Sequence, residues 1–340
     1  MTKRPPLVIG HRGAPGYRPE HSRSSYELAF EMGVDAVEPD VVATADGVLV
    51  VRHENEISTT TDIAERPEFA DRKTTRTIDG QKLTGWFTED FTWNELSTLR
   101  CRERLPQLRP SSASFNDMQP MMRFTDLLDA VREASLVRGR EIGVVLEVKH
   151  AHYFSSIGLD LAPLVERDLR ERGWADGEWP LTIESFEGTV LGDVRQRGIR
   201  ALYVYLLESK GKPADLVAAV GVHAPTYARQ LTPAGLDELA GQFDGISVSK
   251  SLLVDRNGTE LVTAAHARDL RVFTWTCRPE NAFLAPKNRG PGGRAAFGDW
   301  QAEWRHIART GVDGVFVDHP DLGVDLFRER LRVHSPRAIG

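Results

Sequence analysis

The sequence predicts an α/β chain folded as a TIM-type (β/α)8 barrel with a β-hairpin arm and a small inserted subdomain. Short apolar runs rich in β-branched residues alternate with helical patterns from end to end, which is typical of βαβ units and a parallel sheet. There are eight such runs, and eight is the strand number of this barrel. Because α/β barrels routinely exceed the average domain size, we expect residues 1–340 to form a single domain.

The expected elements follow in chain order. The eight strand-like runs are residues 7–13, 36–43, 142–148, 181–186, 200–206, 245–248, 272–276 and 314–317. The helical patterns between them include residues 24–32, 125–137, 159–172, 259–269 and 301–310. Such helices provide the crossover connections that parallel strands require.

One further strand, residues 48–53, breaks the alternation and gives the hairpin arm. Only about four residues separate it from the second barrel run, whereas a parallel crossover needs about a dozen or more. We therefore expect it to fold back antiparallel around Asp46-Gly47, a favoured hairpin dipeptide. With these two residues at the turn centre, His53 would lie across from Asp40 and beside Glu38.

Two long segments are expected as insertions. Residues 54–120 are polar and form the expected insertion subdomain; Thr92 and Glu95 have capping-box spacing before a short helix, and residues 105–117 are expected to be a loop. Residues 278–298 contain PKNRGPGG and should lack regular structure. Because both segments follow barrel strands, they should overhang the catalytic face and set substrate choice rather than bond-breaking chemistry.

Composition limits the classes of partner. The 43 basic and 49 acidic residues give a formal charge of -6, which provides no global attraction for nucleic acid. No stretch approaches the roughly 20 consecutive apolar residues that span a bilayer. We expect a cytoplasmic protein without a signal peptide or stable membrane association. The two cysteines, Cys101 and Cys277, are expected to be isolated thiols, with one disulfide as the alternative.

Acidic side chains at two neighbouring strand ends indicate a metal site. Glu38 and Asp40 occupy positions i and i+2 of one strand and therefore point to the same side. Two buried carboxylates repel each other, and a hard divalent cation is the usual compensation. Glu147, near the end of the next barrel strand, could supply a third ligand, and Lys149 shares its face. The alternative is an ordinary Glu-Lys ion pair beside two solvated acids.

Two histidines are expected beside this acidic cluster. His11-Arg12 ends the first strand, where side chains reach the mouth of a barrel, and the hairpin brings His53 to the metal-binding strand. Histidine transfers protons near neutral pH, and the arginine fork matches phosphate oxygens. Two histidines flanking a metal suggest an acid and a base on opposite sides of a phosphorus atom.

Six segments, in this order, resemble signature segments of one family. They are HRGAPGYRPEHS, VEPDVVATADGVLVVRHE, LEVKHAHYF, ESFE, WTCRPENAFL and GVDGVFVDHP, and they lie within residues 7–320. The chain is similar to the glycerophosphodiester phosphodiesterases, and the long segment after His53 resembles that of the larger, periplasmic-type members.

The resemblance implies a TIM barrel with an inserted subdomain that hydrolyses glycerophosphodiesters, such as glycerophosphocholine or glycerophosphoethanolamine, to sn-glycerol 3-phosphate and an alcohol. It implies that one divalent ion, Ca²⁺ or Mg²⁺, serves as cofactor. The positions that match the family's functional residues are His11 and His53 as the catalytic pair, Glu38, Asp40 and Glu147 as metal ligands, Arg12 and Lys149 as phosphate contacts, and Phe186 and Trp275 as the pocket lining. Ordinary barrel packing is the alternative for the two aromatic residues.

The chain departs from the family pattern beside the histidines. Glu54 follows His53 where the family often has Asp, and His21-Ser22 stands where Asn or His with Thr is common. These changes affect the groups that support the histidines. Glu20 could orient His11 or the neighbouring arginine, or form a structural turn.

Two other functions compete with hydrolysis of water-soluble diesters. A phospholipase D-like barrel acting on lysophospholipids would need an exposed apolar lip or a membrane-binding helix. A non-catalytic barrel that binds phosphate ligands would be expected to lack an acid or a base, whereas both histidines are present.

Overall fold

The computed structural model describes residues 5–254 and 258–333. The strands are β1 (Leu7–His11), β2 (Ala36–Glu38), β3 (Asp40–Ala43), β4 (Leu49–Val51), β5 (Thr74–Ile78), β6 (Gln81–Gly85), β7 (Gly143–Val148), β8 (Leu181–Ser185), β9 (Leu202–Leu207), β10 (Gly245–Ser249), β11 (Arg271–Cys277) and β12 (Gly314–Val317).

The α-helices of the described residues are α1 (Arg23–Met32), α2 (Trp93–Leu96), α3 (Pro110–Ala113), α4 (Phe124–Arg138), α5 (Ala151–Ser156), α6 (Leu161–Glu171), α7 (Gly188–Gln196), α8 (Ala214–Val220), α9 (Tyr227–Gln230), α10 (Pro233–Ala240), α11 (Gly258–His266), α12 (Trp300–Thr310) and α13 (Pro320–Val333). Short 3-10 helices are η1 (Ile63–Glu65), η2 (Pro67–Arg72), η3 (Thr88–Asp90), η4 (Gly221–His223), η5 (Lys250–Leu252) and η6 (Pro286–Asn288).

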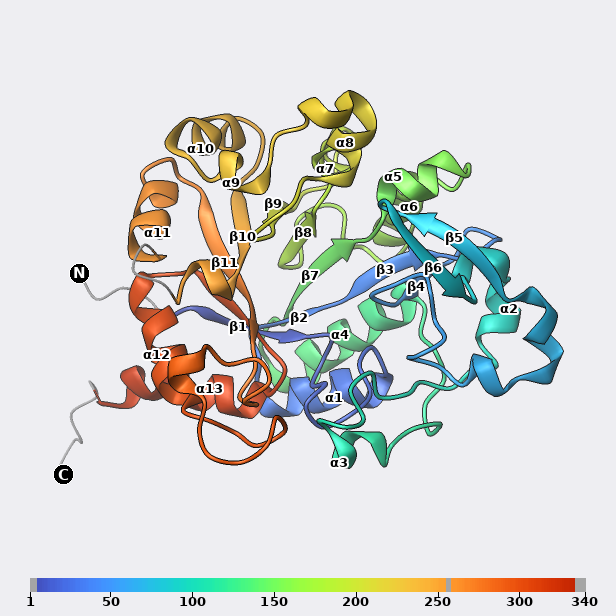
Figure 1. Ribbon diagram of the computed structural model, residues 1–340, viewed down its shortest axis with the longest axis horizontal. Coiled ribbons are helices and arrows are strands. Elements are labelled where there is room, and N and C mark those ends of the chain that lie inside the picture. The colour runs from blue at the N-terminus through green and yellow to red at the C-terminus, as the bar shows by residue number, and fades with distance from the viewer. Residues whose placement is uncertain (1–4, 255–257, 334–340) are drawn as a thin grey trace.

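The parallel strands close into a barrel in the order β2-β1-β12-β11-β10-β9-β8-β7, with β7 pairing back onto β2. The predicted TIM barrel is therefore confirmed, and all eight strand-like runs are strands. The second barrel strand consists of two segments, β2 and β3, because Pro39 between them has no N–H to donate to the ladder. Helices lie outside the strands, and β5, β6 and α2 extend to the right of the barrel (Figure 1).

The barrel interior positions the active-site residues. Six residues fill it and are at most 6% exposed: Ile9, Ala36, Val145, Val204, Phe273 and Phe316. Since side chains on a strand alternate, the residues two positions further along three of these strands point into the mouth of the barrel. They are His11, Glu38 and Glu147.

Local signals explain where the helices begin and end. Ser22 caps α1 by accepting a hydrogen bond from the Ser25 N–H, and Gly33 ends it with a φ of 87°. The predicted capping box of Thr92 and Glu95 is present at α2. The five helices expected from the sequence correspond to α1, α4, α6, α11 and α12.

The hairpin forms, but its expected register is wrong by one residue. Val41 pairs with Val51 and Ala43 with Leu49, so Asp40 faces Arg52 and not His53. The Thr44 N–H donates to the Val48 carbonyl at 3.0 Å, which leaves a three-residue loop instead of the expected two-residue turn. Gly47, with a φ of 72°, provides the left-handed position that such a loop uses.

The two expected insertions contain more structure than their composition suggests. Residues 54–120 include the β5–β6 hairpin, α2, α3 and three 3-10 helices. The expected loop at residues 105–117 is therefore partly wrong, because Pro110 at the first position starts α3. Residues 278–298 contain the 3-10 turn η6. The division of the chain into a barrel and an insertion subdomain stays a prediction.

Two other expectations concern the state of the cysteines and the presence of membrane-spanning helices. Cys101 and Cys277 are both buried and free, as expected. Among the helices of residues 5–254 and 258–333, none combines the length and the apolar character needed to cross a membrane.

Candidate active site

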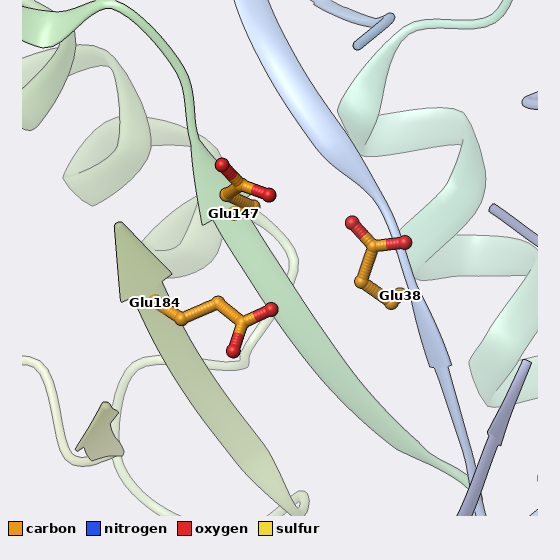
Figure 2. Close-up of side chains that lie close together, drawn as sticks. All are labelled: Glu38, Glu147 and Glu184. Atoms are coloured by element: carbon orange, nitrogen blue, oxygen red, sulfur yellow. The ribbon is translucent and has the colours of Figure 1, made fainter. Parts of the chain in front are cut away.

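Three glutamates meet at the mouth of the barrel. Glu38 at the end of β2, Glu147 on β7 and Glu184 on β8 each place one carboxylate oxygen within 4.8 Å of the others. All three are buried, and their side chains converge on a common space (Figure 2). The sequence analysis identified Glu38 and Glu147 but did not identify Glu184.

The electrostatics of this cluster favour a cation. Burial, reinforced by the neighbouring acids, raises the pKa of Glu38 and of Glu184 well above the ordinary value. Burial also raises the pKa of Glu147 to about 8, although Lys149 opposes this rise. Glu184 Oε2 has no hydrogen-bond partner among the described residues. Buried acids with an unsatisfied oxygen fit a hard divalent ion, which prefers oxygen ligands.

Asp40 lies beside the three glutamates but has other partners. Its Oδ2 is 2.9 Å from His21 Nε2 and 3.3 Å from Arg12 Nε, and its Oδ1 is 3.8 Å from Lys149 Nζ. Burial alone would raise its pKa, but the surrounding groups, including Lys149 and Arg12, hold the pKa well below the usual value. Asp40 Oδ1 accepts no hydrogen bond from the described residues. Its role as a metal ligand stays a prediction.

Both predicted catalytic histidines are supported through Nδ1 by a carboxylate. His11 Nδ1 lies 2.6 Å from Asp318 Oδ1, and His53 Nδ1 contacts Glu54. Burial, followed by the charge of Arg12, lowers the pKa of His11 to about 4 and that of His53 to about 3. Both rings are therefore neutral at pH 7. With Nδ1 donating to a carboxylate, Nε2 of each ring can accept a proton.

The two cationic residues expected at the phosphate site are also present. The Arg12 backbone N–H donates to Glu38 Oε2 at 2.9 Å, and its guanidinium donates to Glu20 at 3.0 Å. Lys149 Nζ donates to Glu147 Oε1 at 2.7 Å and lies 3.3 Å from His53 Nε2. The hairpin therefore brings His53 to the site despite its shifted register.

The loop after β1 that carries Arg12 is tightly constrained. Arg12 has a φ of 55°, an uncommon conformation for a residue with a side chain. Gly13 follows with a φ of 93°, and a Cβ there would lie 2.7 Å from the backbone carbon of Ser25. Glu20 lies in a turn and its side chain binds Arg12, so two of the roles considered for it are observed together, whereas no contact with His11 is found among the described residues.

The predicted aromatic residues contact each other. Phe186 and Trp275 pack edge to face with ring centroids 5.7 Å apart, and Lys149 Nζ lies 5.6 Å from the Phe186 ring centroid. Trp275 also packs against the interior apolar layer, as ordinary barrel packing would require. Phe186, Lys149 and Glu147 line a pocket of about 600 Å³ that opens beside the acidic cluster.

Sequence reasoning missed two arginines of the segment between β6 and α3. Arg104 forms ion pairs with Glu54 and Glu20, and Arg109 forms ion pairs with Asp318 and Glu280. The density of arginine in RERLPQLR was the available signal, but it does not identify partners far away in the chain.

Comparisons with known proteins identify the family of the chain. A model of the glycerophosphoryl diester phosphodiesterase family matches residues 11–322. A glycerophosphodiester phosphodiesterase of Arabidopsis thaliana is 30% identical over 346 residues, which cover 93% of this chain and 86% of the relative.

Two solved structures share the fold. A putative glycerophosphoryl diester phosphodiesterase from Silicibacter pomeroyi has a TM-score of 0.67 and 22% identity, covering 97% of this chain and 95% of that one. An Oleispira antarctica phosphodiesterase in complex with the product sn-glycerol-3-phosphate has a TM-score of 0.64 and 17% identity, covering 95% and 96%. By the family match and the long alignment to the plant enzyme, the chain belongs to the glycerophosphoryl diester phosphodiesterase family, and it is a glycerophosphodiester phosphodiesterase.

Proposed function

We propose that this phosphodiesterase depends on one divalent ion, Ca²⁺ or Mg²⁺, and hydrolyses glycerophosphocholine or glycerophosphoethanolamine to sn-glycerol 3-phosphate and the free alcohol. One observation carries the proposal: two histidines, each paired with a carboxylate, lie at the barrel mouth that also holds the buried glutamate cluster. The product-bound structural neighbour from Oleispira antarctica supports the same product.

The metal would be held by Glu38, Glu147 and Glu184, with Asp40 as a further ligand. When bound, a divalent ion stabilises the negative charge that develops on the phosphoryl oxygens. Arg12 and Lys149 would bind the same oxygens and orient the phosphorus atom between the two histidines.

The histidines would divide the proton transfers. One imidazole takes a proton from the attacking hydroxyl as the new P–O bond forms, and the other gives a proton to the alcohol oxygen as the old P–O bond breaks. We assign His11 as the base and His53 as the acid. Because a bound phosphodiester carries negative charge, it would raise the pKa of the adjacent histidine and allow that ring to enter the reaction protonated.

The pocket beside the site supports an amine alcohol as the leaving group. Lys149 lies at its phosphate end, and the lining also includes the carboxylate of Glu187 and the rings of Tyr153 and Tyr227. Glu187 is 3% exposed, its Oε2 accepts a hydrogen bond from the His152 backbone N–H at 2.7 Å, and burial raises its pKa to about 8. A choline or ethanolamine cation would favour the ionised form of Glu187, and the neighbouring aromatic rings would add cation–π contacts.

Product analysis tests the proposed reaction. Incubation with glycerophosphocholine in ¹⁸O-labelled water should release free choline and sn-glycerol 3-phosphate carrying the label on phosphate. Release of phosphocholine would contradict the bond assigned here. Transient glycerol cyclic phosphate would show that the glycerol 2-hydroxyl, and not water, attacks first.

One observation favours a second substrate class, the lysophospholipids. Val217 and Val220 on α8 and Val222 on η4 are 42%, 51% and 83% exposed, and Val217 also lines the pocket. This apolar rim could contact an acyl chain. A kcat/KM for lysophosphatidylcholine that equals or exceeds the value for glycerophosphocholine, and that falls in Val217→Ser, would favour lysophospholipids.

A further inference from the structure

One short segment of the chain contacts the carboxylates that bind the two candidate catalytic histidines. Arg104 and Arg109 lie five positions apart between β6 and α3, in the expected insertion and not on a barrel strand. Their ion-pair partners come from four distant places in the sequence: Glu20, Glu54, Glu280 and Asp318.

Arg104 joins the groups behind His53 and Arg12. Its Nη2 lies 2.5 Å from a carboxylate oxygen of Glu54 and 2.5 Å from one of Glu20. Glu54 contacts His53 Nδ1, and Glu20 accepts a hydrogen bond from the Arg12 guanidinium. A single guanidinium therefore fixes two carboxylates, and each carboxylate orients one residue of the predicted site.

Arg109 plays the corresponding part behind His11. Its Nη2 lies 2.6 Å from Asp318 Oδ2, while the other oxygen of Asp318 contacts His11. Its Nε donates to Glu280 at 2.7 Å, and its side chain is 4% exposed. Arg278 also binds Asp318 at 2.6 Å, so this carboxylate has two guanidinium partners.

We infer that Arg104 and Arg109 are positioning residues for the phosphodiesterase reaction, acting through Glu54 and Asp318 on the orientation of His53 and His11. The inference rests on the proposed function, because it assumes that the two histidines transfer protons. Carboxylates that orient a reactive imidazole must themselves be held, and loss of such outer partners typically costs about 10- to 100-fold in activity.

Arg104 and Arg109 should differ in their effect on turnover, because Glu54 and Asp318 differ in their number of arginine partners. Glu54 has Arg104 as its arginine partner and is 29% exposed, so it can turn towards water when Arg104 is removed. Asp318 is fully buried and keeps Arg278 when Arg109 is removed. Arg104 should therefore have the larger effect on turnover.

The chain provides a closely matched control. Arg102, two residues before Arg104, also bridges two carboxylates, Glu65 and Asp117, and is 22% exposed against 23% for Arg104. These partners do not contact either histidine in the described residues. Arg102→Gln and Arg104→Gln therefore make the same chemical change in the same segment.

The test compares kcat, KM and thermal unfolding for these two variants on glycerophosphocholine. Arg104→Gln should lower kcat by about 10- to 100-fold and raise KM to a smaller extent through the Glu20–Arg12 contact, while Arg102→Gln keeps both kcat and KM within about twofold. Arg104→Lys, which keeps the charge but loses the planar fork, should retain the fold and show an intermediate kcat. Equal kcat values for the Arg102 and Arg104 variants would overturn the inference, as would full activity of Arg104→Lys.

A double-mutant cycle shows whether Arg104 acts through Glu54. In a Glu54→Gln background, Arg104→Gln should cost much less in kcat than in the wild-type background. Independent, multiplicative losses would contradict the inference. His53→Ala separates this inference from the proposed function: if His53→Ala keeps normal kcat, the proposed proton transfer and the inference both fail, whereas a loss in His53→Ala without one in Arg104→Gln removes the inference alone.

Discussion

Each candidate catalytic histidine has a carboxylate on Nδ1, and the side chains of His11 and His53 are 9% and 26% exposed. This arrangement fixes the tautomer and presents Nε2 to the substrate, so the ring is prepared for proton transfer. We predict that His11→Ala and His53→Ala each lower kcat for glycerophosphocholine by about 10²- to 10⁴-fold, because proton transfer contributes about that factor. Steady-state kinetics with thermal unfolding measures both activity and folding.

His266 provides the control for these variants. Its Nε2 is paired with Asp313 at 2.9 Å, so it is also a carboxylate-bound histidine, but it lies on α11, outside the candidate site. His266→Ala should keep kcat within about twofold. Near-normal kcat in His53→Ala would show that His53, which the hairpin brings to the site, is not catalytic.

Asp318 makes the stability of the chain sensitive to acid. Burial alone would raise its pKa, but Arg278, Arg109 and His11 outweigh burial and hold the pKa well below the ordinary value. A depressed pKa in the folded state stabilises the fold above the unfolded-state pKa of about 3.9, and this stabilisation is lost as the pH falls through the folded-state pKa.

We therefore predict that the free energy of unfolding lost in Asp318→Asn is largest at neutral pH and shrinks below about pH 4. Urea unfolding of wild type and variant at pH 7 and pH 3 measures this difference. An unchanged difference at the two pH values would show that the Asp318 carboxylate is not the origin of the acid sensitivity.

Residue types and spacing predicted most, but not all, of the residues at the candidate site. Glu38 and Glu147 could be found because each stands two positions beyond an inward-facing residue, near a strand end. Glu184 obeys the same rule, two positions after Thr182 on β8, but the next residue on its face is Phe186, so no charged side chain at i+2 marks it as Asp40 marks Glu38 and Lys149 marks Glu147. The sequence alone does not distinguish Asp40, whose carboxylate pairs with Arg12 and His21, from the glutamates that form the buried cluster.

At the scale of elements, the turn after β1 depends on Gly13. Its φ of 93° favours glycine, and an added Cβ would meet the Ser25 backbone at 2.7 Å. Gly158 has a similar φ of 82° but has no atom within 4 Å of an added Cβ. We predict that Gly13→Ala destabilises the fold by about 1–3 kcal/mol more than Gly158→Ala, because only Gly13→Ala also creates a clash. Chemical denaturation measures the difference, and equal losses would contradict this reading of the turn.

The barrel strands could be predicted because their signal is local. Apolar, β-branched runs mark each strand, and the eight predicted runs are the eight barrel strands. The register of β3 with β4 could not be predicted from Asp46-Gly47 alone, because this dipeptide suits two loop lengths. The three-residue loop also satisfies the Thr44 side chain, which donates to Asp46 at 2.6 Å and accepts from the Val48 N–H at 2.9 Å.

At the scale of the whole molecule, the insertion and the barrel share one active site. The β5–β6 hairpin lines the pocket through Asp79 and Gln81, and its expected influence on substrate choice stays a prediction. Arg104 and Arg109 from the same insertion bind the carboxylates behind the histidines, and the expected separation of specificity from chemistry stays a prediction. Their partners are 50 to 209 positions away in sequence, and only the fold brings them together.

In the proposed reaction, a divalent ion and two histidines act together at the mouth of the barrel. The most direct test is the rate of choline release from glycerophosphocholine by the full chain after exhaustive chelation, before and after Ca²⁺ or Mg²⁺ is restored. We predict that chelation abolishes turnover and that one of these ions restores it, because Glu38, Glu147 and Glu184 form a buried oxygen cluster suited to such an ion. Full activity in the metal-stripped chain would contradict the claim.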